Sequence, residues 1–297
     1  MASAPDPPRR TAAARALRRG LRGAGTSGRA GLAIVVAFVA LALLAPLCSP
    51  YDPRAYTGDP LLAPSAGHWL GTNDLGQDIL SELLWGARTS VAVGLTVGLL
   101  STLAALYVAL VAGVHGGRVD RALMRVVDAF LAEPRLPFII VLAAYLGASI
   151  WNLILVLALF SWAKGARVIR AQVLSLMTRT HVEAARLFGA SRAYLITRHI
   201  LPEVAPLAAY KLIKTSSYAL VAEAGLAFLG IGDPSTKSWG MMFYHVQSRP
   251  EIYYTGIWLW WFLPPALCLV LLVLGLVLLQ HGMERLVDPS LQPGGGR

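Results

Sequence analysis

The chain has 297 residues, of which 56% are hydrophobic and only 14% charged, and its formal net charge is +10 at pH 7. An ordinary soluble domain carries about 25% charged residues, so the composition argues against a soluble globular domain, a disordered chain or a coiled coil. It predicts a polytopic membrane protein, whose basic residues between apolar runs fit the positive-inside rule better than nucleic-acid binding.

The N-terminal part of the chain divides into three segments. Residues 1–29 carry seven arginines among Ala, Gly and Pro, and we expect them to form a disordered basic tail. Residues 30–47 are uncharged. This run is longer than the core of a signal peptide, about 7–15 residues, so we interpret it as an uncleaved first transmembrane helix. Residues 48–87 are rich in Pro, Gly and Tyr and are expected to form an external loop.

Five further spans are expected, because a membrane helix needs about 20 mostly apolar residues. Residues 89–114 and 256–280 are uncharged and form two clear spans, and residues 204–228 form a weaker one. The uncharged run 136–163 is too long for one helix and too short for two. It predicts a helical hairpin with one arm starting near Leu123. The sequence therefore predicts an all-α polytopic membrane protein with six transmembrane helices.

The distribution of Lys and Arg predicts the orientation of these spans. With the N-terminal tail inside, the cytoplasmic segments hold 19 of the 26 Lys and Arg residues and the external segments hold three. The cytoplasmic segments are then residues 1–29, 115–125, 164–203 and 284–297, and the external ones are residues 48–87 and 229–255. Both termini are expected in the cytoplasm, with residues 284–297 as a second tail.

Motifs for catalysis and for bound cofactors are missing from the sequence. It contains no G-x-x-x-x-G-K-[ST] phosphate loop, no H-E-x-x-H or C-x-x-C metal spacing and no G-x-S-x-G nucleophile motif. We therefore expect a non-catalytic chain that binds no metal or other cofactor of its own.

The connection between the fourth and fifth spans carries signals for two short helices. Thr180-x-x-Glu183 is a capping box that predicts a helix start, and Gly189 predicts the end of that helix. Ser191 is a candidate N-cap for a second short helix, which Pro202 is expected to bound.

The first short helix has an apolar face. Val182, Ala185 and Phe188 fall on roughly one side, with the small Ala184 beside them. Small residues allow a helix to lie deep in a partner's groove, where Phe188 would fill a pocket. An amphipathic turn that lies on the membrane surface is equally compatible with these residues.

The same segment resembles the EAA loop of bacterial ABC importer permeases. The residues that carry the resemblance are Glu183-Ala184-Ala185, then Gly189, then a segment that ends at Leu201-Pro202. Three residues separate Ala185 from Gly189, and nine separate Gly189 from that last segment. Other motifs resemble the dipeptide, oligopeptide and nickel branch of these permeases, over about residues 66–290. The segment 68–78 is similar to the branch pattern H-W-L-G-T-D-x-x-G-R-D, with Asn73 and Gln77 in place of the acid and the arginine. The remaining matches are Gly86-Ala87-Arg88-x-Ser90, Gly116-Gly117-x-x-Asp120, Pro134-x-x-Pro137, the run 223–232 and Trp239-Gly240.

This resemblance implies a type I ABC importer transmembrane domain over residues 88–283, preceded by one extra N-terminal helix. Residues 176–203 would be a cytoplasmic coupling loop. The residues implied in coupling to the ATPase are Glu183, Ala184, Ala185, Phe188 and Gly189.

The resemblance also implies partners. They are a second homologous permease, two ATPase subunits that bind ATP and Mg, and an extracytoplasmic solute-binding protein, all at the bacterial inner membrane. Di- or oligopeptides are the solutes that it favours, with nickel, opines and sugar-like solutes left open. An ion-coupled secondary transporter or a channel, either without ATPase partners, is the alternative, with Glu223, Glu133 or Asp128 as the ion site of the transporter.

Several residues in the spans are candidates for the pathway or its gating, because intramembrane ionisable groups are rarely exposed to lipid and prolines bend helices. They are Glu223, Pro134 and Pro137. A structural alternative for Glu223 is that it faces Lys211 or Lys214.

Three further patterns concern packing and the outer surface. Gly94-x-x-x-Gly98 predicts close helix packing. The cluster at 258–261 predicts an interfacial aromatic belt. Trp239 and Gly240, in the external segment 229–255, are candidates for docking the binding protein.

Overall fold

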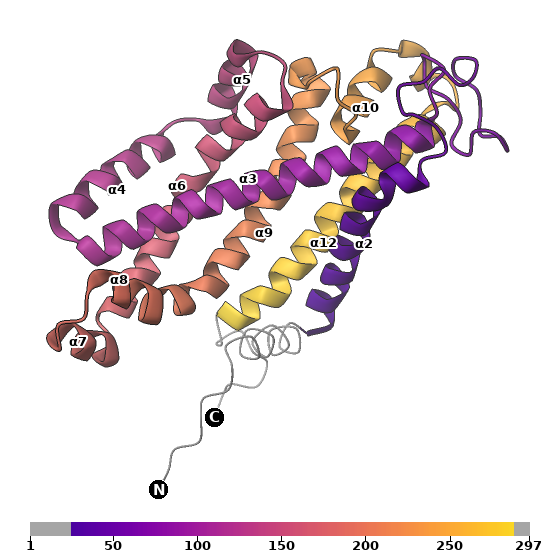
Figure 1. Ribbon diagram of the computed structural model, residues 1–297. Helices are drawn as coiled ribbons and strands as arrows, with labels where there is room; N and C mark the ends of the chain where they lie inside the picture. The colour runs from indigo at the N-terminus through magenta and orange to yellow at the C-terminus, as the bar shows by residue number, and fades with distance from the viewer. Residues whose placement is uncertain (1–24, 288–297) are drawn as a thin grey trace, which may run out of the picture.

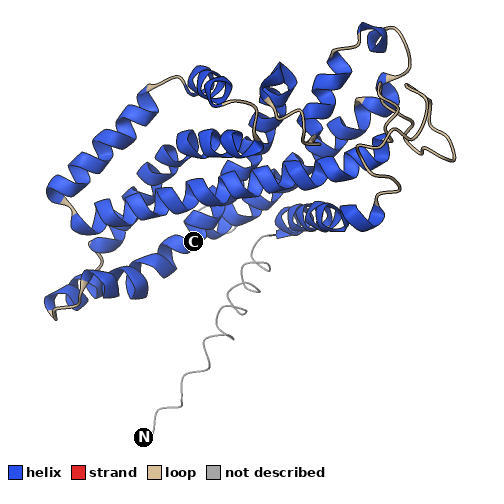
Figure 2. Ribbon diagram, turned by 45° about the horizontal axis from the view of Figure 1, so that its top comes forward, coloured by secondary structure: helices blue, strands red, loops and turns tan. Residues whose placement is uncertain are grey.

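The computed structural model describes residues 25–287, which form a bundle of helices (Figures 1 and 2). The predictions for residues 1–24 and 288–297 lie outside the described residues. Over 25–287 there is no strand, only an isolated bridge between Thr72 and Asp78. The elements are α2 Gly25–Cys48, α3 Ile79–His115, α4 Gly117–Ala132, α5 Arg135–Leu146, α6 Ile150–Met177, α7 Thr180–Leu187, α8 Arg192–Leu195, η1 Ile196–Ile200, α9 Leu201–Leu226, η2 Ala227–Ile231, α10 Trp239–Gln247, η3 Pro250–Tyr253, α11 Trp258–Trp261 and α12 Leu263–Val287.

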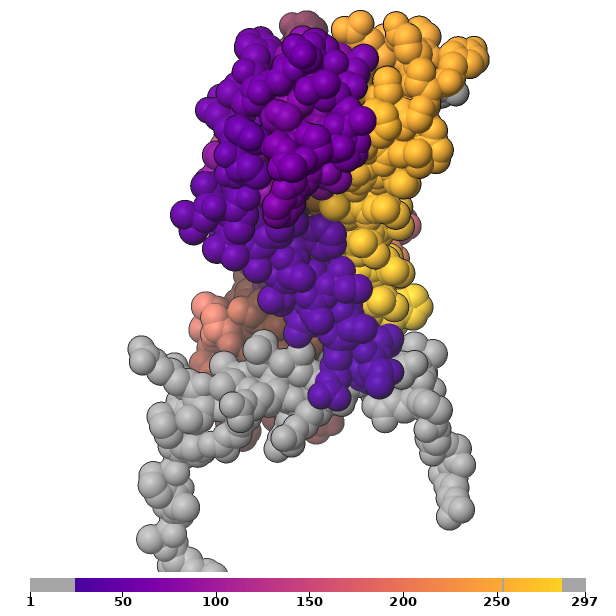
Figure 3. All heavy atoms as spheres, turned by 90° about the vertical axis from the view of Figure 1, so that its right-hand side faces the viewer, coloured from indigo at the N-terminus to yellow at the C-terminus, as the bar shows by residue number. Residues whose placement is uncertain are grey.

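Helix α3, with 37 residues, runs the length of the bundle, and α6 and α9 pack against it (Figure 1). Helices α2 and α12 lie side by side along one flank, and Figure 3 shows their surfaces in contact. Helices α7 and α8 lie at one end of the bundle, which we call the α7 end. Helix α10 and residues 49–78 lie at the opposite end, which we call the α10 end.

Five stretches of helix are long and apolar enough to cross a membrane, which confirms the all-α polytopic class. They are Gly25–Cys48, Ile79–His115, Ile150–Met177, Arg192–Ile231 and Trp258–Glu284. They correspond to five of the six expected spans. The remaining one, the first arm of the predicted hairpin, has a different structure.

The predicted first arm is not one helix, and this expectation was wrong. It is divided at Glu133 and Pro134 into α4 and the 12-residue α5. Proline disfavours helical backbone in the residue before it, and Glu133 is accordingly extended, with φ −83° and ψ 143°. Helix α4 is amphipathic, and ion pairs to Arg170 and Arg167 hold its Asp120 and Asp128 against α6.

Other boundaries also differ from those expected. Helix α2 begins at Gly25, inside the predicted tail 1–29, and α12 continues past residue 283 to Val287. The external loop ends at residue 78, because Asp78 caps α3 by accepting a hydrogen bond from Ser81 N at 2.8 Å. Nine residues assigned to the loop 48–87 are therefore the first turns of α3.

Glycines set the closest helix contacts, as the Gly94-x-x-x-Gly98 pattern predicts. A Cβ on Gly94 would lie 2.7 Å from Leu220 Cγ, and one on Gly98 would lie 3.0 Å from Leu212 O. Helices α3 and α9 therefore approach too closely there for larger residues. Helices α2 and α12 meet in the same way, since a Cβ on Gly275 would lie 2.9 Å from Ile34 Cβ.

The tryptophans at 258–261 do not all form the expected aromatic belt. Trp258 is 43% exposed, but Trp261 is fully buried in the core at the α10 end, together with Trp239 and Met242. Trp261 is therefore a packing residue, because α11 is a single turn folded back on the bundle before α12 begins.

Candidate functional site

The helix predicted from residues 176–203 is present as α7, but its start is not the expected capping box. Arg179 is the N-cap, no side chain caps the helix, and Thr180 is already its first residue. The first turn is held from outside the helix, since Arg179 Nη1 donates to Glu203 Oε2 at 2.7 Å. Val182 is 1% exposed and packs in the core formed by the ends of α6 and α9. Tertiary contacts thus replace the local cap.

The other end of α7 closes as predicted at Gly189, which has φ +82°. Ala190 N donates to Ala185 O at 3.0 Å, and Gly189 N donates to Arg186 O at 3.1 Å. This pair of bonds is a Schellman motif, which requires a left-handed residue at the position of Gly189. The motif turns the chain sharply towards α8.

Helix α7 presents its C-terminal end to solvent. Phe188 is 93% exposed and Leu187 is 83% exposed, whereas Ala184 and Ala185 are half-buried and Glu183 is exposed. An open depression beside this end is lined by Ala185, Phe188, Gly189, Ala190, Ser191 and Tyr194. The arrangement offers two adjacent apolar side chains on a helix that is fixed at both ends.

The second short helix begins as predicted, since Ser191 Oγ accepts from Tyr194 N at 3.2 Å. It does not end at Pro202, and that expectation was wrong. Helix α8 continues through the π-helical turn η1 into α9, with Pro202 in the first turn of α9. A widened turn accommodates a proline ring and its missing N–H. Movement of α7 would therefore be passed directly to a membrane-spanning helix.

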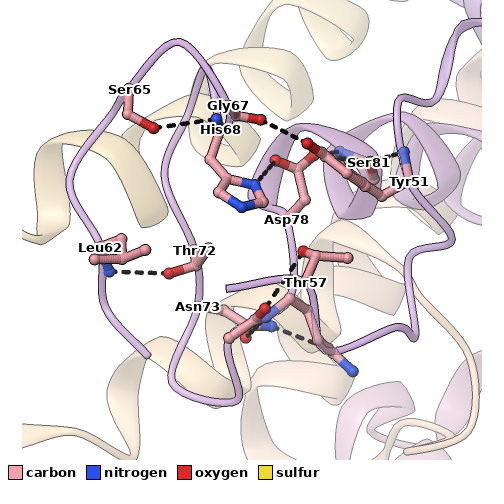
Figure 4. A network of polar contacts seen from close by, with 12 residues as sticks. Tyr51, Thr57, Leu62, Ser65, Gly67, His68, Thr72, Asn73, Asp78 and Ser81 are labelled. Carbon is pink, nitrogen blue, oxygen red and sulfur yellow. Dashed lines mark hydrogen bonds and ion pairs between the residues drawn. The ribbon is translucent and has the colours of Figure 1, made fainter. Parts of the chain in front are cut away.

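At the α10 end, residues 49–78 fold into a structured cap rather than a slack loop (Figure 4). His68 Nδ1 lies 2.9 Å from Asp78 Oδ1, and both side chains are buried. Ser81 Oγ donates to Asp78 Oδ2 at 2.7 Å and accepts from Tyr51 N at 3.1 Å. Asp78 and Ser81, at the start of α3, thus anchor the structured cap through His68 and through Tyr51.

Asn73 and Gln77, the two departures from the branch pattern, form an amide pair in this cap. Asn73 Nδ2 donates to Gln77 Oε1 at 3.0 Å. Lys237 Nζ reaches into the cap from the 229–255 segment and donates to Gln77 Oε1 at 2.7 Å and to Glu82 Oε1 at 2.8 Å. The ion pair at this place is therefore Lys237 with Glu82, between segments far apart in sequence.

Trp239 and Gly240, the candidates for docking the binding protein, are both buried, and their docking role stays a prediction. Trp239 is 0% exposed, and its Nε1 donates to Leu83 O at 3.1 Å. A Cβ on Gly240 would lie 2.7 Å from Ala227 Cβ. Both residues pack α10 against α3 and α9.

Glu223 is 2% exposed and lies where α9 meets α3 and the start of α10, close to the hydroxyls of Ser90 and Ser238. Within the described part of the chain it makes no ion pair with Lys211 or Lys214, which contradicts the structural alternative. Its pathway or gating role stays a prediction, as do those of Pro134 and Pro137. Pro134 is the N-cap of α5 and Pro137 lies in its first turn, where a missing N–H is tolerated.

Sequence reasoning missed Leu187, Arg179 and Lys237. A three-residue spacing was used to define the face of α7, and Leu187 does not follow that spacing. The contacts of Arg179 and Lys237 bridge 24 and 155 residues, respectively. No local pattern reports such pairs.

Comparison with known proteins gives a consistent result. Residues 105–293 match the family described as "Binding-protein-dependent transport system inner membrane component". The chain is 33% identical over 260 residues to a probable D,D-dipeptide transport system permease protein of Escherichia coli, covering 86% of this chain and 85% of that protein. It is 32% identical over 266 residues to an oligopeptide transport system permease protein of Bacillus subtilis (88% and 85%). It is 33% identical over 263 residues to a glutathione transport system permease protein of Pectobacterium atrosepticum (87% and 85%).

Proposed function

Because the chain belongs to the family of binding-protein-dependent transport system inner membrane components and is a permease subunit of an ABC importer, we propose that it forms half of a translocation pathway for di- or oligopeptides. Its relatives include D,D-dipeptide, oligopeptide and glutathione transport system permease proteins, which supports this solute class. Membership in a binding-protein-dependent family argues against an ion-coupled transporter or a channel.

The α7 end is the proposed coupling surface, formed by Glu183, Ala184, Ala185, Phe188 and Gly189, with Leu187 added. The exposed pair Leu187 and Phe188, on a helix held at both ends, is the observation that carries the proposal. A large apolar side chain in this position is suited to a pocket in a partner. Stiff ends would allow movement of the partner to reach α9 without being absorbed in a loop.

The family implies ATPase and binding-protein partners, and the finer assembly is part of the proposal. It contains two ATPase subunits, which hydrolyse ATP with Mg, and a second homologous permease, whereas this chain binds no nucleotide. The binding protein would be received at the α10 end, where Trp69 and Tyr56 are 72% and 75% exposed. Pro134, Pro137 and Glu223 would lie along the pathway or move with it.

The chain is a multi-pass protein of the inner membrane. We place its α7 end and both termini in the cytoplasm, because the basic segments of the sequence gather on that side. This orientation brings α7 to the compartment that holds ATP and turns the structured cap outward.

Co-purification and uptake test the proposed coupling. The full chain is expressed with its ATPase subunits, second permease and binding protein, and the variants Phe188→Ala and Ala185→Glu are compared with wild type. Both are expected to lose ATPase co-purification and uptake of a labelled dipeptide mixture. Tyr56→Ala, which removes an exposed aromatic at the opposite end, is the control for ATPase binding and should retain ATPase co-purification. Normal ATPase binding and uptake by both α7 variants would overturn the coupling assignment.

A further inference from the structure

Four basic side chains gather around one small cavity between α5, α6 and α9. The cavity has a volume of about 180 Å³, and its basic lining residues are Arg135, Lys164, Lys211 and Lys214. The rest of its lining is hydroxyl-bearing or small, namely Ser161, Gly165, Thr215 and Tyr218. No Asp or Glu lines the cavity among the residues that the structure describes.

These basic groups lack counter-ions. None of the four makes an ion pair within residues 25–287. Lys211 and Lys214 each lie over the ring of Tyr210, with Nζ at 5.7 and 5.9 Å from its centroid. A buried nitrogen of Arg135, Nη2, has no hydrogen-bond partner, and neither does the buried Ser161 Oγ. The cavity therefore presents unused donors.

The cavity lies beside the middle of α6, one of the helices long and apolar enough to cross a membrane. Lys164 follows Ile150, the first residue of α6, by 14 positions in a 28-residue helix, which is about 21 Å along the axis. Unpaired cations at such a depth are costly in lipid and normally face water, an anion or a transport pathway. This face of α5, α6 and α9 is thus a pathway surface rather than a lipid surface.

The N-terminus of α5 adds to the positive electrostatic potential of the cavity. The break at Pro134 places the first residue of α5, Arg135, on the cavity, and no side chain caps this helix. The uncapped N–H groups of a helix N-terminus favour anions, as do guanidinium and ammonium groups. All of these groups are matched to a carboxylate.

We propose that this cavity binds the carboxylate of the transported solute midway through the permease. The inference rests on the proposed function and narrows its solutes to those with a free carboxylate, such as peptides with an unmodified C-terminus. The donors around the cavity would replace part of the carboxylate's hydration and hold it between the two sides of the membrane. A lipid phosphate has the same charge, so the test includes lipids of different charge.

Charge-selective labelling tests the site without knowledge of the solute. Ser161→Cys is introduced into the complete complex with Cys48→Ser and Cys268→Ala, in phosphatidylcholine nanodiscs, without nucleotide and after vanadate trapping. A negatively charged sulfonate thiol reagent is compared with a positively charged trimethylammonium one. The ratio of the sulfonate labelling rate to the trimethylammonium labelling rate is expected to be at least about tenfold higher than for a free thiol in solution. Thr215→Cys provides a second reporter should Ser161→Cys not assemble.

Removal of the charges should remove the preference. Lys211→Gln together with Lys214→Gln should bring the reagent ratio towards that of a free thiol, and Arg118→Gln, an exposed basic residue on α4, should not change it. No reaction in either state, or no preference for the sulfonate, overturns the proposal. A preference that disappears when phosphatidylglycerol is added would assign the site to lipid and overturn it as well.

Uptake separates this inference from the proposed function. Wild-type protein should take up a mixture of free-acid dipeptides, and the same mixture with amidated C-termini should enter at least about tenfold more slowly. The double variant Lys211→Gln, Lys214→Gln should take up the free-acid mixture at least about tenfold more slowly than wild type. Equal entry of both mixtures, with non-selective labelling, would defeat the carboxylate site and leave the peptide importer intact. Selective labelling without peptide uptake would support the anion site and defeat the peptide assignment.

Discussion

Single side chains decide how the α10 end is held together. Lys237 and Glu82 form an ion pair whose side chains are 16% and 2% exposed, and Asn73 and Gln77 complete the network. Glu82 is buried in the first turn of α3, so its charge depends on Lys237 for compensation. The Asn73–Gln77 amide pair carries no charge, so the charge of Lys237 compensates that of Glu82 alone.

The first prediction concerns this pair. Lys237→Met should destabilise the protein by about 3–5 kcal/mol, because it leaves the Glu82 carboxylate buried without its partner. The double variant Lys237→Met with Glu82→Leu should recover much of that loss, since no buried charge remains. Arg249→Gln is the control, because its pair with Asp74 is more exposed and worth about 0–1 kcal/mol. The measurement is the unfolding temperature of the purified protein, and equal shifts for Lys237→Met and Arg249→Gln would contradict it.

The second prediction concerns Gly189. No atom lies within 4 Å of a Cβ built there, so substitution acts through the backbone, whose φ is +82°. Asparagine tolerates this left-handed region, but a β-branched residue is an outlier in it. Gly189→Val should therefore lose ATPase co-purification and uptake, and Gly189→Asn should keep most of both. Gly67→Val, at an open position with ordinary φ, is the control. Equal behaviour of Val and Asn at 189 would show that the left-handed turn is not needed.

At the level of elements, the sequence was a good guide where one local signal acts alone. The long apolar runs, the cap at Ser191 and the turn at Gly189 depend on neighbouring residues, so the local sequence reports them. The start of α7 was misread because the Arg179–Glu203 pair acts from another helix. The break between α4 and α5 was expected only as a proline bend, because apolarity alone does not distinguish one long helix from two. The burial of Trp239 was missed because an irregular segment gives no periodicity.

The third prediction tests the contact between α3 and α9. Gly98→Ala should destabilise the bundle, because its Cβ would meet the Leu212 carbonyl at 3.0 Å and also the Ser216 side chain. Backbone cannot move aside as a flexible side chain does, so α3 must shift away from α9. Gly225→Ala, in α9 with open space around it, is the matched control. It should be neutral or stabilising by up to about 1 kcal/mol. Unfolding temperatures of the two variants, measured side by side, decide the matter, and a neutral Gly98→Ala would refute the close contact.

On the scale of the whole molecule, the two ends of the bundle are chemically different. The α10 end is a closed cap with buried polar networks, and the α7 end presents exposed apolar residues on a stiff helix. The break at Pro134 and the basic cavity lie between them. These three features, in this order, fit the proposed arrangement, in which the solute arrives at one end, is bound in the middle, and the ATPase acts at the other end.

The last prediction is the orientation of that axis. Trp69→Cys and Phe188→Cys, each in a chain with Cys48→Ser and Cys268→Ala, place single thiols at residues that are 72% and 93% exposed at opposite ends. In intact cells with a permeable outer membrane, an impermeant maleimide should label residue 69 and not residue 188, and everted vesicles should reverse the result. The reason is the charge balance, since the segments that the sequence assigns to the cytoplasm hold 19 of 26 Lys and Arg residues, and 18 when Lys164 in the middle of α6 is left out. Retention of basic loops sets topology. Labelling of residue 188 from outside would separate α7 from the compartment of ATP, and the coupling proposal would then fail together with the orientation.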